Sequence, residues 1–219
     1  MNGINDDRMG TMDKDRLCKT CMGSQVDCPG HFGHIKLKLP VYHYSMLDYV
    51  RKVLRCVCCR CAHLLSDSPT NEELKKQLQQ KALLRNSKSR FNAVFALTQS
   101  LKECPKCQTR NHKYRKATMR IEIEIQDDAI LKEMTVQDPK QDLWPEHAKG
   151  ILEKITPEHL EYMGLNKNTA NPMNLIIEDL AVAPPPVRPS VARSNMRRSE
   201  DDLTMAYRSI VKTNNELIR

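Results

Sequence analysis

Nine cysteines in three groups constrain this chain more than any other feature of its 219 residues. The groups are Cys18, Cys21 and Cys28, then Cys56, Cys58, Cys59 and Cys61, then Cys104 and Cys107. An odd number of cysteines and an N-terminus without an apolar run argue against the disulfide framework of a small secreted domain. No stretch approaches the roughly 20 apolar residues that span a bilayer. We therefore expect a reduced, intracellular protein without a membrane segment, whose cysteines bind metal.

The first group is followed by a histidine at the spacing of a structural zinc site. The run Cys18-x2-Cys21-x6-Cys28-x2-His31 supplies three thiolates and one imidazole, and structural zinc prefers a closed tetrahedron of such ligands. His34 is a rival fourth ligand, but we favour His31 because it keeps the two-residue spacing. Four protein ligands leave no open position, so we expect a structural rather than a catalytic ion.

The second predicted zinc site combines two distant pairs. Cys104-x2-Cys107 is one pair, and residues 56–61 contain two overlapping candidates for the other. These candidates are Cys56 with Cys59, and Cys58 with Cys61. We favour Cys58 and Cys61, because the small Ala62 follows them and small size there lets backbone N–H groups reach a thiolate sulfur. Cys56 and Cys59 would then be buried small hydrophobic residues, and the chain would hold two structural Zn²⁺ ions.

Apolar periodicity predicts three helices in the first half of the chain. They are expected over residues 43–55, from a capping box at Thr70 and Glu73 as far as Ala82, and along residues 91–101. A strand is expected where isoleucines at 121, 123 and 125 alternate with glutamates. Residues 1–40 are expected to be loop-like.

The second half is expected to be helical over residues 128–180. Thr156-Pro157 and Asn171-Pro172 each place a capping side chain before a proline at the first helical position. Gly164 is expected to end the helix between them.

A proline-rich run, residues 184–189, separates these helices from a last one. Each proline lacks an N–H, so we expect an extended, rigid connector rather than a helix, with an SH3-type peptide ligand as the alternative. Ser199 and Asp202 are expected to cap the last helix. Its apolar residues recur near a 3.5-residue spacing from Leu203 to Leu217, which fits one arm of a coiled coil. Because the pattern is unfinished at Arg219, we expect the natural protein to continue.

Net charge gives a weaker signal about partners. The formal charge of +8 favours a polyanionic partner such as nucleic acid. Lys and Arg are spread along the chain rather than concentrated in one tract, so a solvated basic surface is the alternative.

Several blocks, in their order, resemble the largest subunit of archaeal and eukaryotic RNA polymerases. The most specific is Cys-Pro-Gly-His-Phe-Gly-His-Ile at residues 28–35. Further blocks are residues 6–10, 39–43, 56–65, 184–191 and 200–204. The proline tract is most similar to that of RNA polymerase II, whereas the tight Cys104-x2-Cys107 pair is similar to archaeal forms.

The resemblance implies an N-terminal clamp fragment. The implied fold class is α+β: a zinc-stabilised, helix-rich polymerase clamp core and head with small zinc-ribbon elements and the start of a coiled coil. The implied domains are a zinc-binding loop region (1–40), a clamp head with the second zinc site (41–127), a helical clamp part (128–180), a Pro-rich connector (181–199) and the first arm of the clamp coiled coil (200–219).

The resemblance also implies a role in DNA-directed RNA synthesis in the nucleus. The clamp would hold template DNA and the RNA–DNA hybrid, contact the second-largest and smaller polymerase subunits, and bind initiation and elongation factors at the coiled coil. The nucleotidyltransferase centre, with its Mg²⁺, would lie in another part of the subunit, because Asn-Ala-Asp-Phe-Asp-Gly-Asp is absent from this sequence.

Phosphate contacts are expected from the densest basic run beside a metal pair: Arg110, Lys113, Arg115 and Lys116. A solvated ribbon face is the alternative interpretation of that run. The alternatives for the whole chain are a stand-alone zinc-ribbon nucleic-acid binder and a RING-like adaptor. A RING interleaves its ligand pairs, however, whereas the first site here closes between residues 18 and 31.

Overall fold

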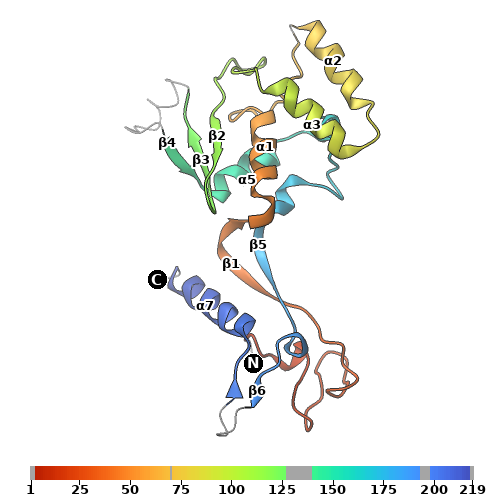
Figure 1. Ribbon diagram of the computed structural model, residues 1–219, viewed down its shortest axis with the longest axis vertical. Helices are drawn as coiled ribbons and strands as arrows, with labels where there is room; N and C mark the ends of the chain where they lie inside the picture. The colour runs from red at the N-terminus through yellow and green to blue at the C-terminus, as the bar shows by residue number, and fades with distance from the viewer. Residues whose placement is uncertain (1–2, 70, 127–139, 193–197, 218–219) are drawn as a thin grey trace. The chain divides into compact units, whose positions relative to one another are not determined.

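The computed structural model describes residues 3–69, 71–126, 140–192 and 198–217 (Figure 1). The chain divides into two units. We call Pro40–Ile177 the central unit, and Met1–Leu39 with Glu178–Arg219 the terminal unit. Strands β1 (Gly33–Tyr42) and β5 (Ile176–Val182) pair with each other, and both boundaries fall within them. The mixture of helices and small sheets confirms the predicted α+β class.

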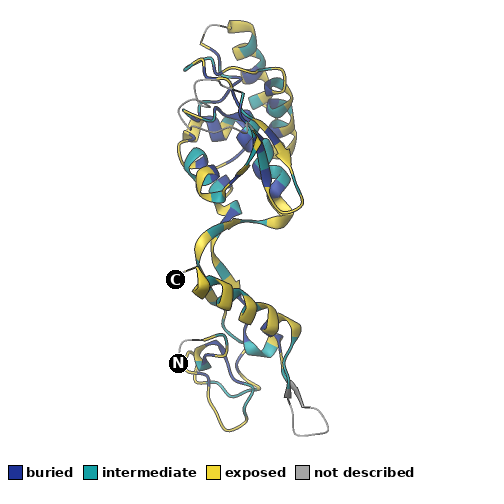
Figure 2. Ribbon diagram, turned by 90° about the vertical axis from the view of Figure 1, so that its left-hand side faces the viewer, coloured by how far each residue is buried: buried dark blue, intermediate teal, exposed yellow. Residues whose placement is uncertain are grey.

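The central unit is built around helix α1 (Leu47–Cys56), which buries an apolar face against α3 and β2. Val50, Val53 and Leu54 are fully buried there, and burying such a side chain contributes about 1.5–3 kcal/mol. Figure 2 shows buried residues on the helices and strands of this unit. Its other helices are α2 (Glu72–Ala82), α3 (Ser87–Thr98), α5 (Pro145–Glu153) and α6 (Pro157–Tyr162), with 3₁₀ turns η2 (Tyr44–Met46) and η3 (Pro172–Leu175).

A three-stranded antiparallel sheet completes the central unit. Its strands β2 (Lys113–Lys116), β3 (Ile121–Glu124) and β4 (Lys140–Leu143) lie in the order β2-β3-β4. Ile121 pairs with Leu143 and Ile123 pairs with Tyr114, so one face of the sheet is apolar and buried. The alternating isoleucines thus form the strand that their spacing predicts.

The terminal unit contains one long helix and little apolar core. Helix α7 (Asp202–Glu216) is accompanied by 3₁₀ turns η1 (Asp7–Met9) and η4 (Pro185–Val187) and by the short paired strands β6 (Val191–Ala192) and β7 (Arg198–Ser199). The Asn214 side chain on α7 bonds the backbone of β1, accepting from Lys38 N at 2.8 Å and donating to Lys36 O at 3.0 Å. Polar contacts therefore attach α7 to the rest of this unit.

Two helix starts differ from the sequence-based prediction by one or two residues. The N-cap of α2 is Asn71, whose side chain accepts from Leu74 N, while the predicted cap Thr70 lies outside the described residues. The N-cap of α7 is Asp201, which accepts from Leu203 N, in place of Ser199 and Asp202. In both cases an Asn or Asp oxygen bonds an otherwise unpaired N–H of the first turn.

The proline run is not wholly extended, which corrects the prediction. Pro185–Val187 form the 3₁₀ turn η4, because the two donors that this turn needs come from Val187 and Arg188, which have N–H groups. The φ that proline fixes also suits this turn. Asn171-Pro172 likewise begins a 3₁₀ turn rather than an α-helix.

Two broader expectations about secondary structure are wrong in part. Strand β1 begins inside residues 1–40, which were expected to be loop-like, and its burial alternates along residues 33–38. Strands β4 and β5 fall within 128–180, which was expected to be helical; residues 127–139 lie outside the described part. The first predicted helix starts as the 3₁₀ turn η2 before α1. Among the helices described, none has the length and apolar content to cross a membrane.

Candidate metal centres

The three Cys-x2-Cys pairs share one backbone geometry. In each pair, the N–H four positions after the first cysteine donates to the carbonyl oxygen of that cysteine. These bonds are Met22 to Cys18 at 2.8 Å, Ala62 to Cys58 at 3.0 Å, and Gln108 to Cys104 at 2.9 Å. The N–H of the first cysteine then donates to the carbonyl five positions later, in Gly23, His63 and Thr109, at 2.9 Å each time. Each pair is therefore a closed turn that presents two sulfurs on one side.

A left-handed residue closes each of these turns. Met22, Ala62 and Gln108 have φ of 57°, 53° and 59°, and they are the non-glycine residues with positive φ in the described part of the chain. Such a conformation costs a non-glycine residue about 1–2 kcal/mol. The position holds Met, Ala and Gln, so small size is not what it requires, and our reason for favouring Cys58 and Cys61 is corrected. The shared requirement is the turn itself.

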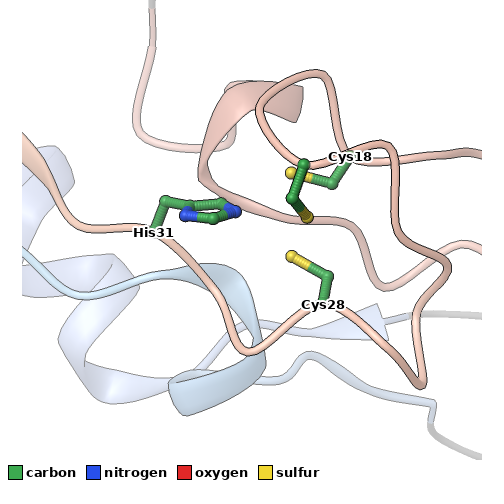
Figure 3. A group of neighbouring side chains, drawn as sticks. Cys18, Cys28 and His31 are labelled. Carbon is green, nitrogen blue, oxygen red and sulfur yellow. The ribbon is translucent and has the colours of Figure 1, made fainter.

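The first four-ligand group lies in the terminal unit. Cys18, Cys21, Cys28 and His31 offer ligand atoms that all lie within 4.8 Å of one another. Figure 3 shows the sulfurs of Cys18 and Cys28 and the ring of His31 pointing toward one another. The Nε2 atom of His31 is buried without a hydrogen-bond partner, which fits a nitrogen that needs a metal ion. His34 lies exposed on β1, outside the group.

A glycine allows the chain to deliver His31. Gly30 has φ of +85°, and a Cβ there would lie 2.7 Å from Cγ of Pro184. No side chain fits at that distance, so the proline tract lies close against the loop. His31 N–H then donates to the carbonyl of Met9 at 3.0 Å, which fixes the backbone that carries the imidazole.

The second four-ligand group lies in the central unit. Cys58 and Cys61 come from the turn after α1, and Cys104 and Cys107 from the turn after α3. Their sulfurs lie 3.5 Å apart for Cys58–Cys107, and 3.6 Å apart for both Cys61–Cys104 and Cys61–Cys107. A tetrahedron with Zn–S bonds of about 2.3 Å places its sulfurs about 3.8 Å apart. The four side chains therefore fit a tetrahedral zinc ion with only a small adjustment.

One thiol in each group has a lowered pKa. Burial raises the pKa of Cys18, but hydrogen bonds from the backbone N–H groups of Cys21 and Thr20, together with those from the Cys28 and Cys21 thiols, outweigh it and bring the pKa to about 6. Burial likewise raises the pKa of Cys107, but the hydroxyl and backbone N–H of Thr109 bring it to about 6. Since the thiolate is the form that binds zinc, these hydrogen bonds favour metal binding at neutral pH.

The two remaining cysteines differ from each other. Cys56 is fully buried in the apolar core at the end of α1, and burial raises its pKa to about 12. It is the buried small residue that was expected. Cys59 is half-exposed, which corrects the expectation for it. Its N–H donates to Oδ1 of Asn111 at 3.0 Å.

Asn111 joins the two turns of the second group, and sequence reasoning missed it. Its Oδ1 accepts from Cys59 N–H, and its Nδ2 donates to the carbonyl of Val57 at 2.9 Å. Its own N–H donates to the carbonyl of Lys102 at 2.8 Å. An asparagine four residues after a Cys-x2-Cys pair is the one signal of this role in the sequence.

A buried arginine, also missed, organises the terminal unit. Arg188 is 3% exposed and donates to Ala183 O at 2.8 Å, Asn5 Oδ1 at 2.8 Å and Thr204 Oγ1 at 3.1 Å. A further bond joins it to the carbonyl of Ile4. This single guanidinium thus connects the N-terminal loop, the proline tract and α7. The Pro-Val-Arg-Pro run gave no sign of this role.

The predicted phosphate-binding residues lie on or beside β2, and three of them are paired with carboxylates. Arg110 contacts Glu103 at 3.1 Å, while Lys113 and Arg115 both contact Glu124, at 3.4 and 3.3 Å. Lys116, at the end of β2, is exposed. Exposed ion pairs of this kind are worth about 0–1 kcal/mol, so a phosphate can compete with them.

Comparison of the sequence with known proteins identifies the family of this chain. The family model described as "RNA polymerase Rpb1, domain 1" matches residues 1–219. The chain belongs to this family, the N-terminal part of the largest RNA polymerase subunit.

Two curated relatives match nearly the whole chain. "DNA-directed RNA polymerase II subunit RPB1" of Euplotoides octocarinatus is 38% identical over 227 residues, covering 98% of this chain and 46% of the relative. "DNA-directed RNA polymerase subunit Rpo1N" of Methanocaldococcus jannaschii is 31% identical over 220 residues, covering 98% of this chain and 15% of the relative. The chain therefore spans less than half the length of either relative.

Proposed function

We propose that this chain is a zinc-stabilised clamp part of a DNA-directed RNA polymerase, and that it helps to hold template DNA and the RNA–DNA hybrid during transcription. The observation that carries the proposal is a family match over residues 1–219 in a chain whose cysteines form two closed groups with four potential ligands each. The enzyme is a nucleotidyltransferase, and its Mg²⁺ belongs to another part of the subunit. The setting is the nucleus, in keeping with the relative named as an RNA polymerase II subunit.

The eight gathered side chains bind two structural zinc ions in this proposal. Cys18, Cys21, Cys28 and His31 bind one ion, and Cys58, Cys61, Cys104 and Cys107 bind the other. Each ion keeps its own unit rigid, because small metal sites gain much of their folding free energy from the ion. Rigid units let a clamp move as a body rather than deform.

Helix α7 begins a coiled coil in this proposal. Its Thr204, Tyr207 and Asn214 face its own unit, whereas Leu203 and Leu217 are 46% and 54% exposed. An exposed apolar stripe at this spacing suits a second helix. Such an arm is where initiation and elongation factors would bind, while other surfaces contact the second-largest and smaller subunits.

The basic side chains of β2 grip nucleic acid without reading its sequence. Lys113 and Arg115 project on one side of the strand, opposite the buried Tyr114. Contacts of this kind release counterions, so the grip weakens as salt rises.

Salt dependence of the assembled polymerase tests the grip. In a polymerase with Lys113→Gln and Arg115→Gln in this chain, the stability of the complex is expected to depend less steeply on salt. The slope of its logarithm against the logarithm of the salt concentration should be smaller by about 2, roughly one per lost phosphate contact. The measurement is the dissociation rate of a transcribing complex across a range of KCl concentrations. Lys75→Gln with Lys76→Gln on α2 removes the same charge from exposed positions and serves as the control.

A third variant is expected to change the dissociation rate in the opposite direction. Glu124→Gln releases both cations from their carboxylate and is expected to slow dissociation. Equal slopes in the β2 variant, the α2 variant and the unsubstituted polymerase would exclude β2 from the grip. The alternative of a stand-alone zinc adaptor is not favoured, because the family match extends over the whole chain.

A further inference from the structure

Two histidines and an aspartate gather in the central unit, apart from the eight cysteine-group ligands. They are His63, Asp67 and His159, whose potential ligand atoms lie within 4.8 Å of one another. His63 and Asp67 lie in the segment after the Cys58–Cys61 turn, and His159 lies on α6. Neither the zinc pattern of the cysteines nor the family match assigns them a role.

The separations between the side-chain atoms fit ligands of one metal ion, although His159 and His63 also make hydrogen bonds to Asp67. Nε2 of His159 and Nε2 of His63 lie 3.3 and 3.8 Å from the same oxygen, Oδ2 of Asp67. Hydrogen bonds from nitrogen to oxygen are centred at about 2.9–3.0 Å. Ligands at about 2.0–2.1 Å from a tetrahedral zinc ion lie about 3.3 Å apart.

Two imidazoles lie close to the Asp67 carboxylate. In the described part of the chain, the cationic groups within ion-pair distance of Asp67 are these two imidazoles. The Nε2 atom of His63 donates to the backbone carbonyl of Asp67 at 2.8 Å, and an ion bound at this nitrogen would replace that hydrogen bond. A divalent cation between the three side chains would be within reach of all three potential ligands.

We propose that His63, Asp67 and His159 form a third metal site, which takes a divalent transition-metal ion such as Zn²⁺. Two imidazole nitrogens and one carboxylate oxygen are ligands that zinc accepts. Their side chains are 16%, 21% and 8% exposed, so solvent reaches the site from one side and water completes the coordination. Without thiolates and with water bound, this site exchanges its ion more readily than the two cysteine groups.

The ion joins α6 to the first turn of the Cys58–Cys107 group. Helix α6 has six residues, and so short a helix is marginal without tertiary support. The carbonyl of His63 already accepts from Cys58 N–H at 2.9 Å, so its backbone belongs to the closed turn. Metal bound to the His63 and His159 side chains therefore ties α6 to that turn.

Metal counting on the full chain tests the proposal. We expect three zinc ions per chain in the presence of micromolar free zinc, and two after dialysis against a weak chelator. Asp67→Asn keeps the size of the side chain and is expected to lower the affinity for the third ion by more than about 100-fold. Even the loss of a hydrogen-bond partner of a metal ligand lowers metal affinity by about 10–100-fold. His159→Ala is expected to do the same, and His147→Ala, at an exposed position on α5, is the matched control.

Cobalt(II) distinguishes this site from the cysteine groups. Titration should give two equivalents with intense thiolate charge-transfer absorption, then a third with weak absorption only, which Asp67→Asn removes. Retention of the first two equivalents shows that the variant remains folded. Two equivalents in the unsubstituted chain, or a third that Asp67→Asn and His147→Ala affect equally, would overturn the proposal.

Discussion

The central unit buries two clusters of apolar side chains, whereas the terminal unit has no such cluster among its described residues. Among the described residues of the terminal unit, the buried apolar side chains are Met9, Cys18, Cys28, Val182 and Pro184, two of which are potential metal ligands. The guanidinium of Arg188 lies at its centre instead. Each unit nevertheless contains one group of four potential ligands.

This difference predicts that the same kind of metal site contributes a larger part of the folding free energy in the terminal unit than in the central unit. In the central unit, a zinc ion would add to a core that includes Leu47, Val53 and Leu54. In the terminal unit, a zinc ion and a few polar contacts would have to replace that core. Small units that cannot bury enough apolar surface depend on metals or other cross-links.

Removing one ligand from the terminal unit is expected to have the largest effect. His31→Ala should lose one zinc ion per chain and unfold this unit, because structural zinc contributes about 10–16 kcal/mol in small domains. Hydrogen exchange should show β1 and α7 losing protection while α1 keeps it. The measurement is exchange followed by peptide mass analysis, with zinc counted in parallel.

The matched control for this change is the neighbouring histidine. His34→Ala removes an exposed ring from β1 and is expected to leave zinc content and exchange unchanged. Equal loss of protection in α1 and α7 after His31→Ala would show that the two units do not differ in their dependence on metal.

A cavity in the central core is the converse test. Leu54 is fully buried on α1, and Leu54→Ala should lower the free energy of unfolding of the central unit by about 3 kcal/mol. Trp144, the single tryptophan of the chain, lies in this unit and reports its urea unfolding by fluorescence. As a control, Leu83→Ala at an exposed position should change the free energy of unfolding by less than about 0.5 kcal/mol. A loss of zinc from the terminal unit in the Leu54 variant would contradict independent stabilisation.

The buried arginine should matter in the terminal unit only. Arg188→Met leaves the acceptors of Ala183, Asn5 and Thr204 without their donor, at a cost of about 2–3 kcal/mol. Hydrogen exchange of α7 measures the loss, with Trp144 fluorescence as the internal reference for the other unit. Arg208→Met, at an exposed position on α7, should leave the exchange of α7 unchanged.

The sequence predicted local features better than those that depend on tertiary contacts. Spacing within 14 residues was sufficient to predict the four potential ligands that the structure brings together in the terminal unit, because one loop carries them all. The partner of Cys104 and Cys107 stayed ambiguous from spacing alone, because 42 residues separate it from them. Asn111, Arg188 and the His63–Asp67–His159 group were missed, since each is defined by residues far apart in the chain.

Secondary structure followed the same rule. The isoleucine alternation in β3 was sufficient to predict a strand, and the burial of α1 follows its apolar spacing. The missing N–H groups of the prolines do not prevent the 3₁₀ turn in the proline run, because Val187 and Arg188 donate its hydrogen bonds. Strand β1 follows the cysteine loop within residues 1–40, and its sign in the sequence is the alternation of Ile35 and Leu37 with lysines.

The smallest expected effect compares the two units at the same backbone feature. Met22 and Gln108 close their turns with φ of 57° and 59°, and both side chains are exposed. Glycine adopts this conformation freely but loses more entropy on folding, so Met22→Gly and Gln108→Gly should each stabilise their own unit by about 0.5–1 kcal/mol. Lys106→Gly, in the same turn as Gln108 but without positive φ, should instead be destabilising. Hydrogen exchange of α7 measures the gain in stability for Met22→Gly, and Trp144 fluorescence measures it for Gln108→Gly. Because the strain is local, equal gains are expected even though the two units differ in their apolar cores. A gain in only one unit would show that its turn adopts the left-handed conformation for a different reason.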